Sequence, residues 1–229
     1  MKFYTILKIS GASLVLVSCV WLLVALSPEK VNHGTETNPI IFGYKLDTNN
    51  TRIQQWLWYY KNVNPVDSSM RAFYYDSVVS MLIEAGFTED RARIYAEIPG
   101  VECNWEPTRF PETSSAKGLW QFTEGRAKAL GLMGKGFDYR LDPYKSTWAA
   151  ASGFQELEQA FDHDLVKILF AYHAGEGILT EMKRLHKTSN AWLYEFPNRE
   201  TYNYCPQVLS LAYVNFLKEK RGQPLSKGN

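Results

Sequence analysis

The chain reads Val101-Glu-Cys-Asn-Trp-Glu-Pro-Thr-Arg-Phe-Pro-Glu-Thr-Ser-Ser-Ala-Lys-Gly-Leu-Trp-Gln121 where an apolar helical run gives way to a glycine turn. Pro99 and Gly100 weaken the last turn of that run, so we expect the chain to kink just before Glu102. The kink would direct the Glu102 carboxylate into a groove, toward aromatic and amide side chains. A carboxylate in such surroundings is suited to acid catalysis on a sugar. The alternative interpretation is a charged loop between two helices.

Apolar residues at helical spacing predict helices on both sides of this segment. One ends at Gly86, and the next begins at Thr88 and leads to Glu102. After the glycine turn, the spacing predicts a short helix capped by Thr123, a longer one after Pro143, one from near Asp164, one running toward His186 and a final one from near Pro206. No convincing run of alternating strand residues is present. The sequence therefore predicts an all-α domain of seven or eight short helices.

The composition fits one well-buried domain with an appendage, because 45% of the 229 residues are apolar. A net charge of +1 gives no reason to expect a nucleic-acid partner. Aromatic residues make up 14% of the chain, which suits helix packing and also a groove that holds sugars. We expect neither a metal nor an organic cofactor, because the histidines lack ligand spacing with Cys or acidic residues; they are His33, His163, His173 and His186.

The N-terminal segment predicts export of the domain. Lys2 and Lys8 precede an uncharged run from Ile9 to Leu26, which is long enough to cross a bilayer as a helix with its N-terminus in the cytoplasm. A cleaved signal peptide is an alternative, although its apolar region is usually shorter. The sequence Leu16-Val-Ser-Cys19 gives a third interpretation, a lipoprotein with Cys19 as the lipidated residue. We favour the anchor or the lipoprotein without separating them.

The domain boundaries follow from these patterns. Residues 1–28 are interpreted as a membrane anchor or signal segment, residues 29–52 as a linker, and residues 53–229 as the catalytic domain. The linker is polar and contains several Pro and Gly residues, which is typical of a connecting segment. Ile40, Ile41 and Phe42 interrupt it and would dock on the domain or on the membrane.

Four motifs in order resemble those of the lytic transglycosylases of glycoside hydrolase family 23, and most closely its membrane-bound D branch. They are Glu102-Cys103, Gly118-Leu-Trp-Gln121, Ala171-Tyr-His-Ala-Gly175 and Tyr204. Two linking segments, Asp138–Pro143 and Glu200–Tyr204, also match. The resemblance runs from about Ile53 to Leu217 and implies a lysozyme-like helical fold, as in goose-type lysozyme. The chain departs from the family at Cys103, where relatives have Ser, and at His173, where they have Asn.

The resemblance implies the cleavage of peptidoglycan by a single carboxyl group. Glu102 would protonate the leaving oxygen at a muramic acid–glucosamine bond and then take a proton from the sugar's own 6-hydroxyl, leaving a 1,6-anhydromuramic end. Such a group needs a raised pKa, which apolar surroundings supply. Glu106, Glu112 and Glu124 are interpreted as solvated loop charges. If one of them faced Glu102, a hydrolytic muramidase would become the better interpretation.

The resemblance also assigns supporting roles in substrate binding. Gln121 would bind an acetamido group of the substrate, and Tyr204 would orient Glu102. Tyr172 and Trp120 would stack on sugar rings or fill the core, His173 would keep a hydrogen-bonding role, and Ser114 would supply a groove hydroxyl. Cys103 follows the catalytic Glu and Cys205 follows the Tyr expected to touch it, so the two either form a disulfide or stay as buried free thiols.

Three functions remain open at this point: a lytic transglycosylase, a hydrolytic muramidase on the same fold, and an inactive glycan-binding scaffold. The expected partners are peptidoglycan strands, the membrane through the N-terminal segment, and an unidentified envelope-spanning machine. The expected location is the cell envelope, with the catalytic domain in the periplasm or outside the cell.

Overall fold

The computed structural model describes residues 38–63, 66–112 and 114–222, and this part of the chain is mostly helical, as the sequence predicted. Two short antiparallel hairpins accompany the helices in this part of the chain. Their strands are two residues long, which is too short to leave the alternating pattern by which a strand is predicted from sequence. The elements in chain order are β1 (Ile40–Ile41), β2 (Tyr44–Lys45), α2 (Thr51–Asn62), α3 (Ser68–Glu84), α4 (Glu89–Tyr95), α5 (Ile98–Cys103), α6 (Glu124–Ala129), β3 (Met133–Gly134), β4 (Phe137–Asp138), α7 (Pro143–Ala160), α8 (Leu165–Ala174), α9 (Glu176–His186), the short 3-10 helix η1 (Ala191–Leu193) and α10 (Arg199–Lys220).

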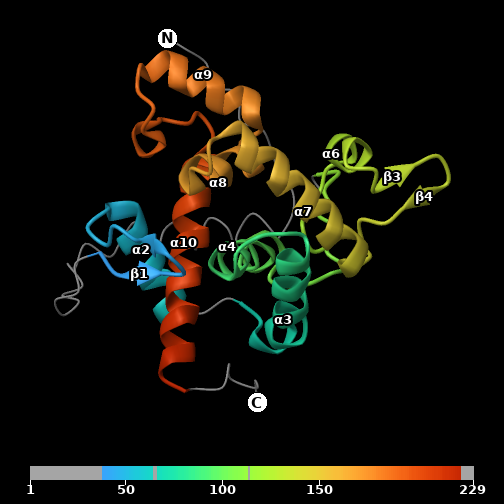
Figure 1. The fold of residues 1–229 in the computed structure, drawn as a ribbon, viewed down its shortest axis with the longest axis horizontal. Helices are drawn as coiled ribbons and strands as arrows, with labels where there is room; N and C mark the ends of the chain where they lie inside the picture. Colours follow the sequence, from blue (N-terminus) through green and yellow to red (C-terminus); the bar gives the residue numbers. More distant parts are fainter. Residues whose placement is uncertain (1–37, 64–65, 113, 223–229) are drawn as a thin grey trace, which may run out of the picture. The chain divides into compact units, whose positions relative to one another are not determined.

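Helix α10 is the central element of this domain (Figure 1). It packs against α2, α4, α5 and α8, and most of its apolar residues are buried. It begins seven residues before the predicted start near Pro206, because the Asn198 side chain accepts a hydrogen bond from the Glu200 N–H and caps the helix. Pro206 therefore lies inside the helix and cannot donate to the carbonyl oxygen of Tyr202. Arg52 of α2 donates to that oxygen instead, at 3.0 Å.

A hairpin occupies part of the segment predicted to be a linker. Strands β1 and β2 pair in antiparallel register, with Ile41 opposite Tyr44. Ile41 and Leu46 are buried, and the Phe42 ring packs edge-on against Phe216 of α10 at 5.3 Å. The sequence left open whether this apolar triplet docks on the domain or on the membrane. Ile41 and Phe42 pack on the domain. The domain boundary at residue 53 remains a prediction.

The predicted anchor or signal segment, residues 1–28, and the candidate lipidation residue Cys19 lie outside the described residues. Among the residues that the structure describes, none of the helices combines the length and apolar character needed to cross a membrane.

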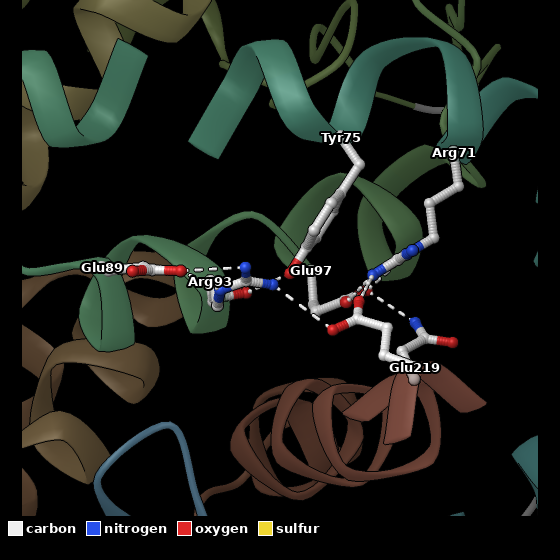
Figure 2. A network of polar contacts seen from close by, with 7 residues as sticks. Arg71, Tyr75, Glu89, Arg93, Glu97 and Glu219 are labelled. Carbon is white, nitrogen blue, oxygen red and sulfur yellow. Dashed lines mark hydrogen bonds and ion pairs between the residues drawn. The ribbon is translucent and has the colours of Figure 1, made fainter. Parts of the chain in front are cut away.

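A buried polar cluster joins α3, α5 and α10 close to the N-terminus of α5. Glu97, the residue before α5, pairs with Arg71 of α3 at 2.5 Å and accepts a hydrogen bond from the Asn215 amide of α10 at 2.9 Å. Figure 2 shows the Arg71 guanidinium between Glu97 and Glu219, with Arg93 and Glu89 extending the network toward the surface. Arg71, Glu97 and Asn215 are all buried. The cluster therefore fixes the start of α5 relative to α3 and α10.

Candidate active site

Helix α5 carries Glu102 on its last turn. The chain breaks earlier than the predicted kink: α4 ends at Tyr95, and α5 starts anew at Ile98 with Pro99 in its first turn, where a proline costs no hydrogen bond. Asn104 ends α5 in the left-handed conformation, with φ of 55°. Helix α5 thus runs in its own direction and brings Glu102 to the wall of a groove.

The Glu102 carboxyl faces Tyr204 of α10, whose hydroxyl donates a hydrogen bond to Oε1 at 2.7 Å. Burial raises the pKa of Glu102 to about 7, the Tyr204 hydrogen bond lowers it, and the negative charge of Glu200 raises it. Burial and the same carboxylate hold the pKa of Tyr204 well above its ordinary value, so Tyr204 remains a hydrogen-bond donor. A carboxyl group with a pKa near 7 exists in both protonation states at neutral pH.

Glu102 lines two neighbouring cavities. The larger, of about 520 Å³, is formed by the segment after α5 and by residues of α6, α7 and α8. It contains six of the residues predicted for the site, namely Glu102, Ser114, Trp120, Gln121, Tyr172 and His173. The smaller, of about 290 Å³, lies between α2 and α5 and includes Trp56, Tyr60, Asn104 and Arg109. A long ligand could therefore pass Glu102 with part of its length on each side.

Stacked rings hold Tyr204 against the groove wall. Tyr172 lies nearly parallel to Tyr204, with ring centres 6.1 Å apart, and donates to the Trp120 carbonyl oxygen at 2.8 Å. The His173 ring lies 4.5 Å from that of Tyr204, and its Nδ1 is 3.0 Å from the Thr201 hydroxyl. Burial lowers the pKa of His173 below its ordinary value, so the imidazole is neutral at pH 7. His173 thus does make a hydrogen bond, to Thr201.

The other predicted groove residues differ in exposure. Trp120 is buried and its indole N–H donates to Thr147 at 2.9 Å, so most of this side chain is core, with an edge on the groove. The Gln121 amide donates to the Gly118 carbonyl oxygen at 2.6 Å, and its backbone has a φ of 47°. Ser114 is exposed, and its hydroxyl accepts from the Ala116 N–H at 3.1 Å.

Three further acidic residues near Glu102 in the sequence face solvent. Glu106, Glu112 and Glu124 are exposed, and Glu106 and Glu124 lie within ion-pair distance of the nearby basic residues Arg109 and Lys128. None of the three lines the larger cavity.

Sequence reasoning missed two charged residues of the larger cavity, Glu176 and Arg126. Glu176 directly follows the Ala171–Gly175 motif and starts α9, so its position next to a groove motif was the available signal. Arg126 lies in α6 and pairs with Glu156 of α7, a contact across 30 residues that no local pattern reveals.

Of the two alternatives considered for Cys103 and Cys205, a disulfide or buried free thiols, the structure shows buried free thiols. The Cys103 sulfur lies 3.3 Å from the carbonyl oxygens of Pro99 and Leu119. Each cysteine follows a residue that faces the site, and consecutive residues of a helix point about 100° apart. Because Glu102 and Tyr204 point toward one another, the cysteines after them are turned away from that contact.

Within the described ranges, no three His, Cys, Asp or Glu side chains are placed to share a metal ion.

The described part of the chain is a helical domain in which the half-buried carboxyl group of Glu102 lies between two cavities. Residues 86–195 match the model of the family described as "Transglycosylase SLT domain". This match confirms the resemblance drawn from the four motifs.

Two curated relatives show where the similarity lies. The chain is 31% identical over 122 residues to "Membrane-bound lytic murein transglycosylase D" of Escherichia coli K12, which is 51% of this chain and 26% of that protein. It is 41% identical over 116 residues to "Peptidoglycan transglycosylase gp16" of Escherichia phage T7, covering 47% of this chain and 8% of that protein. The aligned part is thus about a quarter of the first relative and less than a tenth of the second.

Proposed function

We propose that the protein is a peptidoglycan lytic transglycosylase that cuts the β-1,4 bond between N-acetylmuramic acid and N-acetylglucosamine. The observation that carries the proposal is Glu102, a carboxyl group with a pKa of about 7 at the junction of two cavities, in a transglycosylase SLT domain. Both relatives bear names of enzymes that act as murein or peptidoglycan transglycosylases.

In the proposed reaction, Glu102 acts first as an acid and then as a base. Its proton goes to the glycosidic oxygen, and the bond from that oxygen to the anomeric carbon of muramic acid breaks. The resulting carboxylate then removes the proton of the 6-hydroxyl, and O6 bonds to the anomeric carbon. No water is consumed, and Glu102 ends the cycle protonated again. One carboxyl group suffices for both steps when its pKa lies near the working pH.

The walls of the groove support binding roles for the predicted residues. Gln121 is proposed to accept from an acetamido N–H, because its own amide N–H group is held by the Gly118 carbonyl oxygen. Tyr172 and the edge of Trp120 that lines the cavity would contact sugar rings, and Ser114 would offer a hydroxyl at the rim. His173 would act indirectly, by packing against Tyr204.

Mass spectrometry of the products tests the proposal. Incubating peptidoglycan with the protein should release fragments with 1,6-anhydromuramic ends, and Glu102→Gln should lower the rate by about a thousandfold or more, since the acid and base steps are both lost. Fragments with reducing ends would indicate a hydrolytic muramidase, and no release at all would indicate a glycan-binding scaffold. Anhydro products from the Glu102→Gln variant would contradict the mechanism.

Glu176 gives the hydrolytic alternative a specific form. It is a second carboxylate on the larger cavity, and hydrolysis of such bonds normally uses two carboxyl groups. If Glu176 activated a water molecule, Glu176→Gln would abolish reducing-end products. Under the transglycosylase proposal the same variant still forms anhydro ends, because the 6-hydroxyl replaces that water.

We further infer that the enzyme works in the cell envelope, where its substrate is found. In this proposal residues 1–28 anchor or export the domain, Cys19 is the lipidated residue if the protein is a lipoprotein, and the catalytic domain lies in the periplasm or outside the cell. An envelope-spanning machine would be the partner that needs a local opening in the wall. The mass of the N-terminal peptide from membrane fractions distinguishes an intact anchor, a lipidated cysteine and a cleaved signal.

A further inference from the structure

Arg126 lines the larger cavity but has no part in the proposed cleavage steps. Among the described residues that line this cavity it is the one basic side chain apart from the neutral imidazole of His173. Its Nη2 atom lies 2.8 Å from Glu156 of α7, and the two side chains are 37% and 54% exposed. An ion pair this open to water adds little stability. It places one end of the guanidinium beside Glu156 and leaves most of its five N–H groups for a ligand.

A notch in α7 provides the space for this guanidinium. Gly153 lies in the interior of α7, where alanine would be the better helix former. A Cβ atom at Gly153 would lie 2.8 Å from Arg126 Nη2, too close for atoms that are not bonded. Gly153 also lines the cavity. The glycine thus allows Arg126 to lie against the α7 backbone at the groove wall.

We propose that Arg126, held in the Gly153 notch, binds a carboxylate carried by the muramic acid units of the glycan strand. A guanidinium presents paired N–H donors that match the two oxygens of a carboxylate. In a peptidoglycan strand, muramic acid bears either a stem peptide with carboxylates or, when the peptide is removed, a free lactyl carboxylate. Glucosamine units have neither. The contact would therefore distinguish the two alternating sugars and set which bond lies at Glu102. The inference rests on the proposed function and names the substrate group that this site selects.

The first experiment compares Arg126→Gln with Lys128→Gln in the full chain. Lys128 lies on the same helix, is exposed and does not line the cavity, so its variant removes the same charge without touching the groove. Three glycans serve as probes: strands with stem peptides, strands without them, and neutral N-acetylglucosamine oligomers. The readouts are kcat/KM for anhydro products from the two acidic strands and Kd for the neutral oligomers.

Arg126→Gln should lower kcat/KM on acidic strands by about ten- to a hundredfold relative to Lys128→Gln, the range expected for a hydrogen bond to a charged group. Its Kd for the neutral oligomers should match that of the control. A loss confined to peptide-bearing strands identifies the stem carboxylates as the ligand, and a loss confined to peptide-free strands identifies the lactyl carboxylate. Equal losses on all three glycans, or no loss, would overturn the proposal.

Gly153→Ala tests the same site without removing a charge. The new methyl group would displace the flexible end of Arg126, while α7 gains a better helix former. The variant should be at least as thermally stable as the wild type and yet lose selectivity for acidic strands as Arg126→Gln does. If Gly153→Ala kept its selectivity for acidic strands, the proposal that the Gly153 notch positions Arg126 would be wrong. If the wild type releases no anhydro ends, the proposed function fails, and the Kd of wild type and Arg126→Gln for acidic and neutral glycans still tests the carboxylate site by itself.

Discussion

Burial is the main cause of the raised pKa of Glu102, and two neighbours adjust this pKa in opposite directions. The Tyr204 hydroxyl donates to the carboxylate and lowers its pKa, whereas the negative charge of Glu200 raises it. Since the first step needs protonated Glu102, the rate should fall as the pH rises through about 7. Tyr204→Phe should move this fall to higher pH and lower kcat by about tenfold, because a hydrogen bond to a charged group is lost. Glu200→Gln should move it to lower pH.

The pH dependence of kcat/KM for anhydro product release measures both shifts. Glu195→Gln serves as the control, because Glu195 is also exposed and does not act on the pKa of Glu102. Shifts of Tyr204→Phe and Glu200→Gln in the same direction would show that another group limits the rate.

The sequence motifs indicated which residues lie together at the groove. They did not indicate where the side chains of the adjacent residues point. Glu102, Gln121 and Tyr172 lie on the sequence motifs and line one cavity, and Tyr204 contacts Glu102 from α10. For Cys103 and Cys205, which follow Glu102 and Tyr204, the sequence left a disulfide and free thiols open, and both cysteines are free. Consecutive residues of a helix point about 100° apart. A contact between two residues therefore does not imply a disulfide between the residues that follow them.

At the scale of the helices, one buried ion pair, Arg71–Glu97, joins α3 to the start of α5. Replacing Arg71 by Met would leave Glu97 buried without its cation, which costs about 3 to 5 kcal/mol of unfolding free energy. Arg93→Met is the matched control, because Arg93 belongs to the same network at its more exposed end and should cost about 1 kcal/mol or less. Denaturant unfolding of both variants measures the difference. Similar losses would mean that the buried pair contributes no more than the exposed one.

Apolar periodicity predicted most of the helices, because a helix that packs on a core leaves that pattern in its own residues. It did not predict the break between α4 and α5, where Glu97 continues the chain as an apparently ordinary helix residue. At this break Glu97 bonds to Arg71 and Asn215, 26 and 118 residues away, and such contacts leave no local pattern in the sequence. Within α10, Arg52 donates to the Tyr202 carbonyl oxygen that Pro206 leaves without its helical partner, a contact across 150 residues. Contacts of this kind arise only once the chain is folded.

At the scale of the whole molecule, the raised pKa of Glu102 links activity to stability. The unfolded chain has an ordinary glutamate pKa of 4.5, and the folded protein raises it to about 7. Between these values the folded state binds more protons than the unfolded state, so raising the pH through this range destabilises the fold. Below pH 4.5 both states are protonated and the effect vanishes, and above pH 7 it is complete. Most of this loss of unfolding free energy comes from removing the Glu102 carboxylate from water.

Glu102→Gln should therefore be more stable than the wild type at pH 8, by about 2 kcal/mol after allowance for the partial exposure of Glu102 to the groove. At pH 4 the two proteins should have the same unfolding free energy, because a neutral carboxyl and an amide then occupy the same place. Denaturant unfolding at several pH values measures the difference, with Glu106→Gln as the control for an exposed glutamate. A constant difference at every pH would mean that Glu102 does not titrate near neutrality, and the single-carboxyl mechanism would lose its physical basis.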